Sequence, residues 1–287
     1  MPVGPVGFPR TRVGVPLGRV RAEVALFGAL VAVGFRRWST YRLAAVAGAF
    51  SNTVFGLVRA NVTVAVVGVA GGLVAGYDAT GVATYVWVGQ ALLGSVYIFQ
   101  WTELATRIRT GDIAVDLGRP VDPQLAYLAG DLGRAAFDLI PRGAPPLLVG
   151  ALVTGLALPD TPLPYLLGLV SLVLAVVISF AGRWLVNLAG FWLLDLRGPM
   201  ATYLVAVSVL NGLIVPVHWF PVWLRTLAYC TPFPSMLQAP IDVLTGRVEG
   251  LRALSVIAVQ IGWAVGLLAL GQVVYRRGAR RLVVQGG

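Results

Sequence analysis

Long, continuous apolar runs make up most of the chain and predict helices that cross a membrane. Four of these runs fill residues 81–100, 143–158, 203–217 and 253–274. A fifth fills residues 163–194 and is long enough to continue past the membrane surface near Arg183. A membrane-spanning helix needs about 20 predominantly apolar residues. Because the runs do not alternate with a period of two, helices are expected rather than the strands of a barrel.

One further run, residues 43–76, can be read in two ways. It is apolar apart from Asn52, Arg59 and Asn61, so it could cross the membrane once, or twice with a hinge at Arg59. The apolar pattern leaves open whether residues 59–76 span the membrane, re-enter it or lie at its surface. A single crossing with a cytoplasmic amino terminus places 18 of the 22 basic residues on the cytoplasmic side. Two crossings would put the arginine-rich segment 101–142 outside, against the positive-inside rule. We therefore predict six crossings with both termini in the cytoplasm.

A shorter apolar run precedes these helices. Residues 24–35 would form a helix of about 18 Å, which is too short to span a membrane. Arginines lie on both sides of this run, so both of its ends should face the cytoplasm and the helix should lie along the membrane surface. A signal peptide is the alternative, but no small-residue cleavage site follows. The predicted organisation is a flexible basic tail (1–19), an amphipathic interfacial helix (20–42), a six-helix transmembrane domain (43–275) and a basic cytoplasmic tail (276–287).

The composition also predicts an all-α integral membrane protein. Hydrophobic residues make up 57 % of the 287 residues and charged residues only 12 %, against roughly 25 % charged residues in soluble domains. The chain therefore has too few charges to cover a soluble domain and too many apolar residues to be disordered. Its net charge of +10 comes entirely from arginine. The predicted topology and contact with membrane lipid headgroups account for this excess, so no nucleic-acid partner is expected.

Residues that build common catalytic and cofactor sites are scarce. The chain has no lysine, and a P-loop needs a lysine to hold the phosphates of ATP. One histidine (His218) and one cysteine (Cys230) cannot supply a zinc site. Ser95 and Ser208 lack a hydrolase motif around them. We predict no catalytic residue, no metal site and no cofactor bound by this chain itself. Hydrogen bonds between helices are expected for the amides Asn52, Asn61, Gln90, Asn187, Asn211 and Gln260.

The segment 101–142, expected in the cytoplasm, combines charge with helical periodicity. It holds six of the twelve acidic residues. Glu103 and Arg107 have the spacing of a helical ion pair. Gly111 is placed to end this first helix, and Asp112 to cap the next turn. Residues 123–138 predict a second amphipathic helix. The segment is either a docking surface for a soluble partner or an ordinary solvated connection.

The segment 216–250, expected on the outer side, is rich in aromatic rings and prolines. Rings at this density are typical of the membrane–water interface. Short interfacial or re-entrant helices are therefore expected, with His218 as a hydrogen-bonding residue rather than a catalyst. The residues expected at this outer interface include Trp219, Phe220, Trp223, Pro232 and Phe233.

Three segments together resemble a known family. They are Arg-Ile-Arg-Thr-Gly-Asp-Ile-Ala-Val-Asp-Leu-Gly-Arg-Pro at 107–120, Phe-Trp-Leu-Leu-Asp-Leu-Arg-Gly at 191–198, and the aromatic stretch 219–233. The chain resembles a permease subunit of a bacterial ABC transporter of the type 2 exporter class. The resemblance implies ATP-driven export across the plasma membrane by a pair of permeases, either a homodimer or a heterodimer. ATP and Mg would be bound by two separate ATP-binding subunits that dock beneath this pair.

The resemblance also implies roles for individual residues. Residues 101–117 would form a coupling helix, next to the interfacial helix. The residues expected to couple to the ATP-binding subunit are Trp101, Glu103, Arg107, Arg109, Gly111, Asp112, Arg119 and Pro120. One alternative is a secondary transporter, which should carry intramembrane charges, and only Arg59 and Arg183 are candidates. The other is a membrane-embedded lipid-modifying enzyme, which the scarcity of histidine, cysteine and intramembrane acid disfavours. The sequence does not specify the cargo.

Overall fold

The computed structural model describes residues 17–98 and 101–281, which are helical and contain no β-strand. Three 3-10 turns are η1 (Ala189–Phe191), η2 (Val217–Trp219) and η3 (Phe233–Ser235). The α-helices are α1 (Leu17–Ser39), α2 (Arg42–Val69), α3 (Ala79–Val96), α4 (Glu103–Thr110), α5 (Ile113–Leu117), α6 (Pro123–Asp138), α7 (Ala144–Val153), α8 (Leu163–Leu188), α9 (Arg197–Leu210), α10 (Val222–Tyr229), α11 (Gln238–Leu244) and α12 (Gly250–Ala279).

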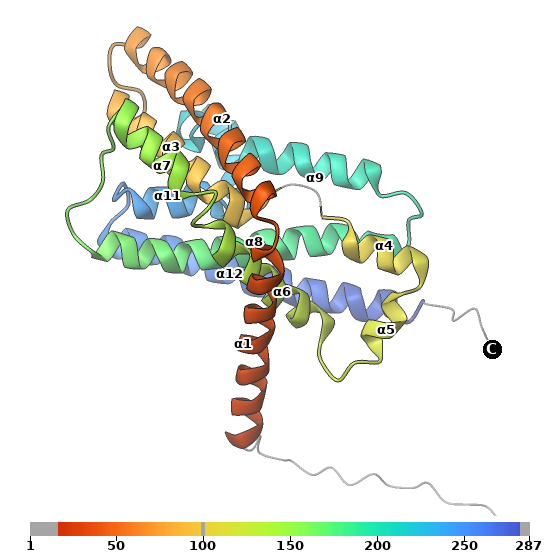
Figure 1. Cartoon of the computed structure of the whole chain (residues 1–287). Helices are drawn as coiled ribbons and strands as arrows, with labels where there is room; N and C mark the ends of the chain where they lie inside the picture. The colour runs from red at the N-terminus through yellow and green to blue at the C-terminus, as the bar shows by residue number, and fades with distance from the viewer. Residues whose placement is uncertain (1–16, 99–100, 282–287) are drawn as a thin grey trace, which may run out of the picture.

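The long helices α8 and α12 lie side by side and give the molecule its long axis (Figure 1). The helices α4 and α5 lie at one end of this axis, close to the end of α12. The helix α11 packs against α8 and α3 toward the opposite end. The predicted all-α fold is therefore confirmed for the described residues.

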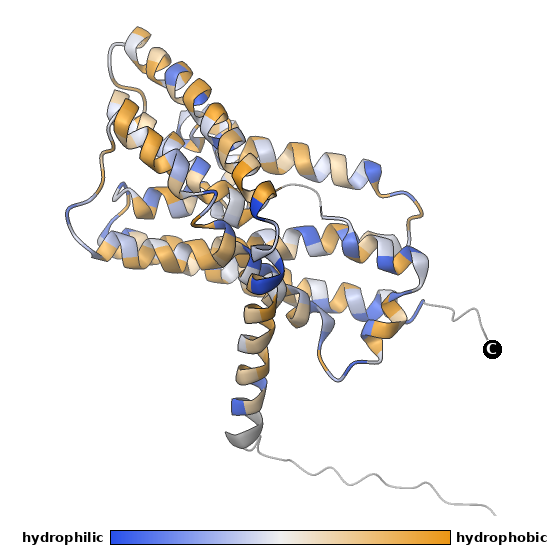
Figure 2. Ribbon diagram, in the orientation of Figure 1, coloured by the Kyte–Doolittle hydropathy of each residue, from blue (hydrophilic) through white to orange (hydrophobic). Residues whose placement is uncertain are grey.

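Within the described part of the chain, three helical segments are long and apolar enough to cross a membrane: α2, α8 together with η1, and α12. Apolar stretches run along these helices (Figure 2), and many large side chains on α2 point outward, among them Phe50 and Phe55. Apolar side chains exposed over such lengths need a hydrocarbon environment rather than water. The chain is therefore embedded in a membrane.

The run 43–76 folds as one long helix followed by a turn. The helix α2 passes through Arg59 without a hinge and ends at Val69, so residues 59–69 are its last part. Gly71, Gly72 and Gly76 have positive φ angles in the turn, a conformation that glycine adopts without steric cost. Asp78 then caps α3 by accepting a hydrogen bond from the backbone of Gly81 (2.7 Å).

Other predicted helices have different ends in the structure. The helix α7 stops at Val153, short of residue 158, because Thr154 and Gly155 (φ +71°) turn the chain. The helix α8 ends at Leu188 rather than at residue 194. The helix α9 is displaced toward the amino terminus and ends at Leu210, where Gly212 (φ +87°) reverses the chain. Apolar residues continue into these loops, so the apolar pattern extended the helices too far.

The helices α6 and α7 are two halves of one kinked helix. Arg142 N donates to Asp138 O (3.1 Å) and Ala144 N to Ile140 O (3.0 Å), so helical hydrogen bonds continue between them. Pro141 lies inside this stretch, and a proline removes one such bond and bends a helix. The predicted boundary near residue 142 is therefore a kink rather than the end of a loop.

The helix α1 is longer than the predicted apolar run 24–35 and crosses the direction of α8 and α12 (Figure 1). It packs along α6 through glycines on both helices. A Cβ atom at Gly34 would lie 2.5 Å from Gly130 O, and one at Gly133 would meet Val31 O. Backbone contact this close is possible only because neither glycine has a side chain.

Gly34→Ala is therefore expected to push α1 away from α6 and lower the free energy of unfolding by about 1–3 kcal/mol. Gly28→Ala is the matched control on the same helix, because nothing lies within 4 Å of a Cβ atom there. It should stabilise α1 by up to about 1 kcal/mol, as alanine favours a helix over glycine. Thermal unfolding of the purified variants measures both effects, and equal melting temperatures would contradict the close crossing.

Candidate functional site

The helices α4 and α5 form a bent unit that rests on its own hydrophobic cluster. Gly111 ends α4 with a φ of +83°, as predicted, and turns the chain toward α5. Leu104, Ile108 and Ile113 are buried against Trp184 and other residues of α6, α8 and α12. The α4–α5 unit is therefore firmly packed against the long helices.

Asp112 does not cap α5 as predicted. Its side chain makes no capping bond, and its Oδ2 instead accepts a hydrogen bond from Thr110 Oγ1 (2.7 Å). The reason is local, since Asp112 has helical dihedral angles and a capping residue normally has extended ones. The carboxylate stays exposed at the bend.

The outward side of this unit combines apolar and charged groups. The apolar side chains of Val115 and Leu117 are 59 % and 43 % exposed. The predicted coupling residues that are exposed around them are Arg109, Gly111, Asp112, Arg119 and Pro120. We call this surface, with Val115 and Leu117 at its centre, the α4–α5 tip.

An exposed ion pair lies near the tip. Arg197 Nε (2.9 Å) and Nη2 (2.7 Å) both donate to Asp195 Oδ2. These hydrogen bonds, with a smaller contribution from Arg109, lower the pKa of Asp195 to about 2. Asp195 therefore stays ionised at any physiological pH and extends the charged rim of the tip.

Of the other predicted coupling residues, Trp101 and Arg107 are partly buried, whereas Glu103 is exposed. Arg107 contacts Asp116 through two hydrogen bonds of 2.9 and 3.0 Å. The predicted pair of Arg107 with Glu103 is therefore wrong, because a better-placed carboxylate competes for the guanidinium. Glu103 lies 3.9 Å from Arg37 of α1 instead. Trp101 packs against Tyr127 in an edge-on contact at 5.5 Å between ring centroids.

A single amide joins the start of α4 to α8. Asn187 Oδ1 accepts a hydrogen bond from Ala105 N (3.0 Å), and its Nδ2 donates to Trp101 O (2.7 Å) and Arg183 O (2.8 Å). Thr102, at the capping position of α4, makes no side-chain cap. Asn187 thus supplies from another helix the cap that α4 lacks, as expected for an amide that bonds between helices.

Charged residues of α6 are buried, so this part of the segment 101–142 is not an ordinary solvated connection, one of the two alternatives that the sequence left open. Asp131 accepts hydrogen bonds from Arg134 Nε (2.8 Å) and from Arg183 Nη2 of α8 (2.7 Å). The side chains of the three residues are at most 10 % exposed. This pairing also neutralises Arg183, one of the two candidate intramembrane charges of the secondary-transporter alternative.

The same cluster of ion pairs reaches α3. Arg134 Nη1 contacts Asp138 Oδ2 (3.1 Å), and the guanidinium donates to the carbonyl oxygens of Gly94 (2.8 Å) and Ser95 (2.9 Å). The signal that could have revealed this cluster is the spacing of residues 131, 134 and 138. Steps of three and four residues place these charges on one face of a helix.

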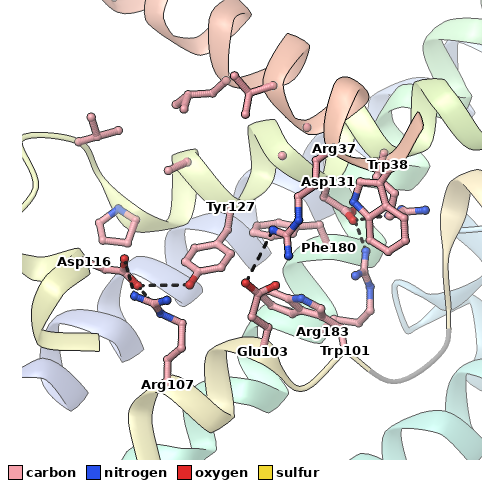
Figure 3. A pocket seen from close by; sticks show the side chains of 18 of the residues that line it. Arg37, Trp38, Trp101, Glu103, Arg107, Asp116, Tyr127, Asp131, Phe180 and Arg183 are labelled. Carbon is pink, nitrogen blue, oxygen red and sulfur yellow. Dashed lines mark hydrogen bonds and ion pairs between the residues drawn. The ribbon is translucent and has the colours of Figure 1, made fainter. Parts of the chain in front are cut away.

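A pocket of about 570 Å³ opens between α1, α4, α6 and α8, directly behind the α4–α5 tip (Figure 3). Tyr127 donates to Asp116 Oδ2 (3.2 Å) across its floor. Burial, together with the Asp116 carboxylate, raises the pKa of Tyr127, so its hydroxyl remains protonated. The volume is in the range of sites for small molecules.

A family described as "ABC-2 family transporter protein" matches residues 58–286. The chain belongs to this family. No curated protein and no solved structure matches the chain. The resemblance seen in the sequence is thereby confirmed.

An ABC-2 family protein is the membrane component of a transporter and not an enzyme by itself. Membership therefore implies a separate ATP-binding partner. The α4–α5 tip and the pocket belong to the matched region, apart from the residues that α1 contributes.

The segment 216–250 folds into the short helices that its prolines predicted, α10 and α11 with η2 and η3. Trp223 is exposed, whereas Trp219, Phe220, Pro232 and Phe233 are partly buried. His218 Nε2 lies 2.9 Å from Asp242 Oδ2, which agrees with a hydrogen-bonding role. Asp242 is buried.

Proposed function

We propose that this chain is the transmembrane permease subunit of an ATP-driven ABC exporter. The chain crosses the plasma membrane six times, with both termini in the cytoplasm and its segment 216–250 outside. The arginine distribution supports this topology through the positive-inside rule. The steep crossing of α1 over the long helices supports its place along the inner membrane surface.

The observation that carries the proposal is the α4–α5 tip. Val115 and Leu117 are exposed apolar residues at the end of the molecule that the topology places in the cytoplasm. Arg109 and Asp112 beside them provide charges of both signs. An apolar centre with a polar rim is the usual anatomy of a protein–protein interface. We assign this surface to the ATP-binding subunit.

The base of the tip makes it suitable as a lever. The helices α4 and α5 are packed on α6, α8 and α12, and Asn187 fastens the start of α4 to α8. Closure of an ATP-bound pair of partner subunits would therefore move the long helices together with the tip. The helix bundle would then alternate between two arrangements, each of which opens the substrate pathway to one side of the membrane. ATP and Mg on the partner would favour one arrangement over the other.

The proposed assembly contains two permeases and two ATP-binding subunits. The exposed apolar residues of α2 and other helices leave room for a second permease chain, identical or different, as well as for lipid. A secondary transporter is less well supported, because Arg183 is paired with Asp131 rather than free for a substrate.

Reversing the two charges at the tip tests the proposed contact. The double variant Arg109→Glu with Asp112→Lys is expected to weaken the partner's stimulated ATPase activity about tenfold, the effect of losing about 1.4 kcal/mol of binding. Membrane insertion should be unchanged, since both side chains are exposed.

The matched control is Asp160→Lys with Arg252→Glu, which reverses two exposed charges at the expected outer side. ATPase activity is measured after co-expression with the ATP-binding subunit. Equal activity of the tip variant and the control would show that the partner docks elsewhere.

A further inference from the structure

The pocket behind the α4–α5 tip carries more positive than negative charge. Three acids line it, Glu103, Asp116 and Asp131, together with five arginines, Arg37, Arg107, Arg119, Arg134 and Arg183. Arg107 is held by Asp116, and Arg134 and Arg183 are held by Asp131, all at hydrogen-bond distance. The positive excess therefore resides in the remaining two arginines.

Arg37 and Arg119 are only loosely held. Arg37 Nη1 lies 3.9 Å from Glu103, and Arg119 Nη1 lies 3.7 Å from Asp116, both beyond hydrogen-bond distance. Their side chains are 64 % and 66 % exposed. They line the pocket from different walls, α1 and the segment after α5. Deeper in the pocket, Arg183 Nε is buried and finds no hydrogen-bond partner among the described residues.

The remaining walls combine aromatic and aliphatic residues. Trp101, Tyr127 and Phe180 line the pocket (Figure 3). The ring of Trp101 contacts Tyr127 edge-on and Phe180 at a tilt. Aromatic faces bind flat or apolar groups, and arginine binds carboxylate, sulfonate or phosphate oxygens in pairs. The combination fits a molecule with an apolar body and an anionic end.

The depth of the pocket agrees with such a ligand. Arg183 lies 20 residues after Leu163 in α8, which is about 30 Å along a helix and close to the thickness of the hydrocarbon core. With α8 starting at the outer surface, the pocket lies at the inner boundary of the membrane. Amphipathic molecules gather at this boundary.

We propose that this pocket binds an amphipathic anion, with Arg37 and Arg119 contacting the charge and Trp101, Tyr127 and Phe180 the apolar body. Its role as the point where cargo is taken up rests on the proposed transport function, whereas the binding itself does not. The anion comes either from the inner membrane leaflet, as a lipid headgroup, or from the cytoplasm, as a soluble aromatic anion.

The test measures binding of naphthalene sulfonate by calorimetry to the full chain in phosphatidylcholine nanodiscs, with empty nanodiscs as the blank. Arg37→Gln and Arg119→Gln should each weaken binding about tenfold, because each removes one charge-assisted contact. Arg37→Lys should retain part of the affinity through its charge. The matched control, Arg21→Gln, changes an exposed arginine of α1 that does not line the pocket, and should bind like the unaltered chain.

Addition of phosphatidylglycerol, an anionic lipid, to the nanodiscs distinguishes between the two possible sources of the anion, the membrane leaflet and the cytoplasm. If it abolishes the sulfonate signal, the pocket takes a lipid headgroup, and if it does not, the pocket takes a soluble anion. The proposal is overturned if sulfonate does not bind, if neutral naphthalene methanol binds as tightly, or if the glutamine variants match Arg21→Gln. The assay contains no ATP and no partner, so its result is independent of the tip variant's effect on ATPase activity.

Discussion

Asp131→Asn is expected to lower the free energy of unfolding by about 3–5 kcal/mol, the usual cost of breaking a buried ion pair by removing one partner. Asp131 accepts hydrogen bonds from Arg134 and Arg183, which come from different parts of the chain, α6 and α8. Arg134 keeps a second carboxylate, Asp138. Arg183 does not, so its charge would be left buried between α6 and α8 without compensation.

A second variant distinguishes the ion pair from general damage to the fold. Asp131→Asn combined with Arg183→Gln removes both charges, so part of the lost stability should return. Asp195→Asn is the matched control, because Asp195 also pairs with an arginine but in full contact with solvent, where such pairs contribute little. Melting temperatures in detergent measure all three variants. A double variant less stable than Asp131→Asn alone would argue against the pair as the source of the stability.

The positions of most helices along the sequence could be predicted from the apolar pattern, but the residues at which they end could not. The core of α12 was predicted from an apolar run, and residues 123–138 were predicted as an amphipathic helix, which is the full extent of α6. The ends of α7 and α9 instead depend on Gly155 and Gly212, whose positive φ angles are set by the packing of the loops that follow. A hydropathy pattern has no information on such packing.

The candidate site could be predicted in outline only. The sequence indicated the segment that forms the α4–α5 tip, and Gly111 ends α4 as expected. The direction of each charged side chain was not predictable, because Arg107 has several carboxylates within reach and contacts Asp116. The buried pair of Asp131 with Arg183 joins residues 52 positions apart, and no local spacing reveals a contact of that range. The pocket depends on the crossing of α1 over α6, which a single sequence does not specify.

Asn187→Leu is expected to separate ATP hydrolysis from transport. The leucine has a similar size but leaves Ala105 N and Trp101 O without the bonds that now connect α4 to α8. Each buried group that loses its partner costs about 1–3 kcal/mol. The start of α4 should therefore loosen from α8, while the outward face of the tip is unchanged. The partner subunit would still dock and hydrolyse ATP, but less of its movement would reach the long helices.

The measurement is the ratio of cargo transported to ATP hydrolysed in cells or vesicles that contain the full transporter. This ratio should fall several-fold for Asn187→Leu, with ATPase activity retained. Asn61→Leu is the matched control, because Asn61 is exposed and its Nδ2 donates only within α2, to Leu57 O (2.7 Å). Asn187→Asp should lie between the two, since it keeps the acceptor for Ala105 N but loses both donors. If transport and hydrolysis fell together in Asn187→Leu, Asn187 would be needed for docking itself, and the tip would not act as a lever fastened to α8.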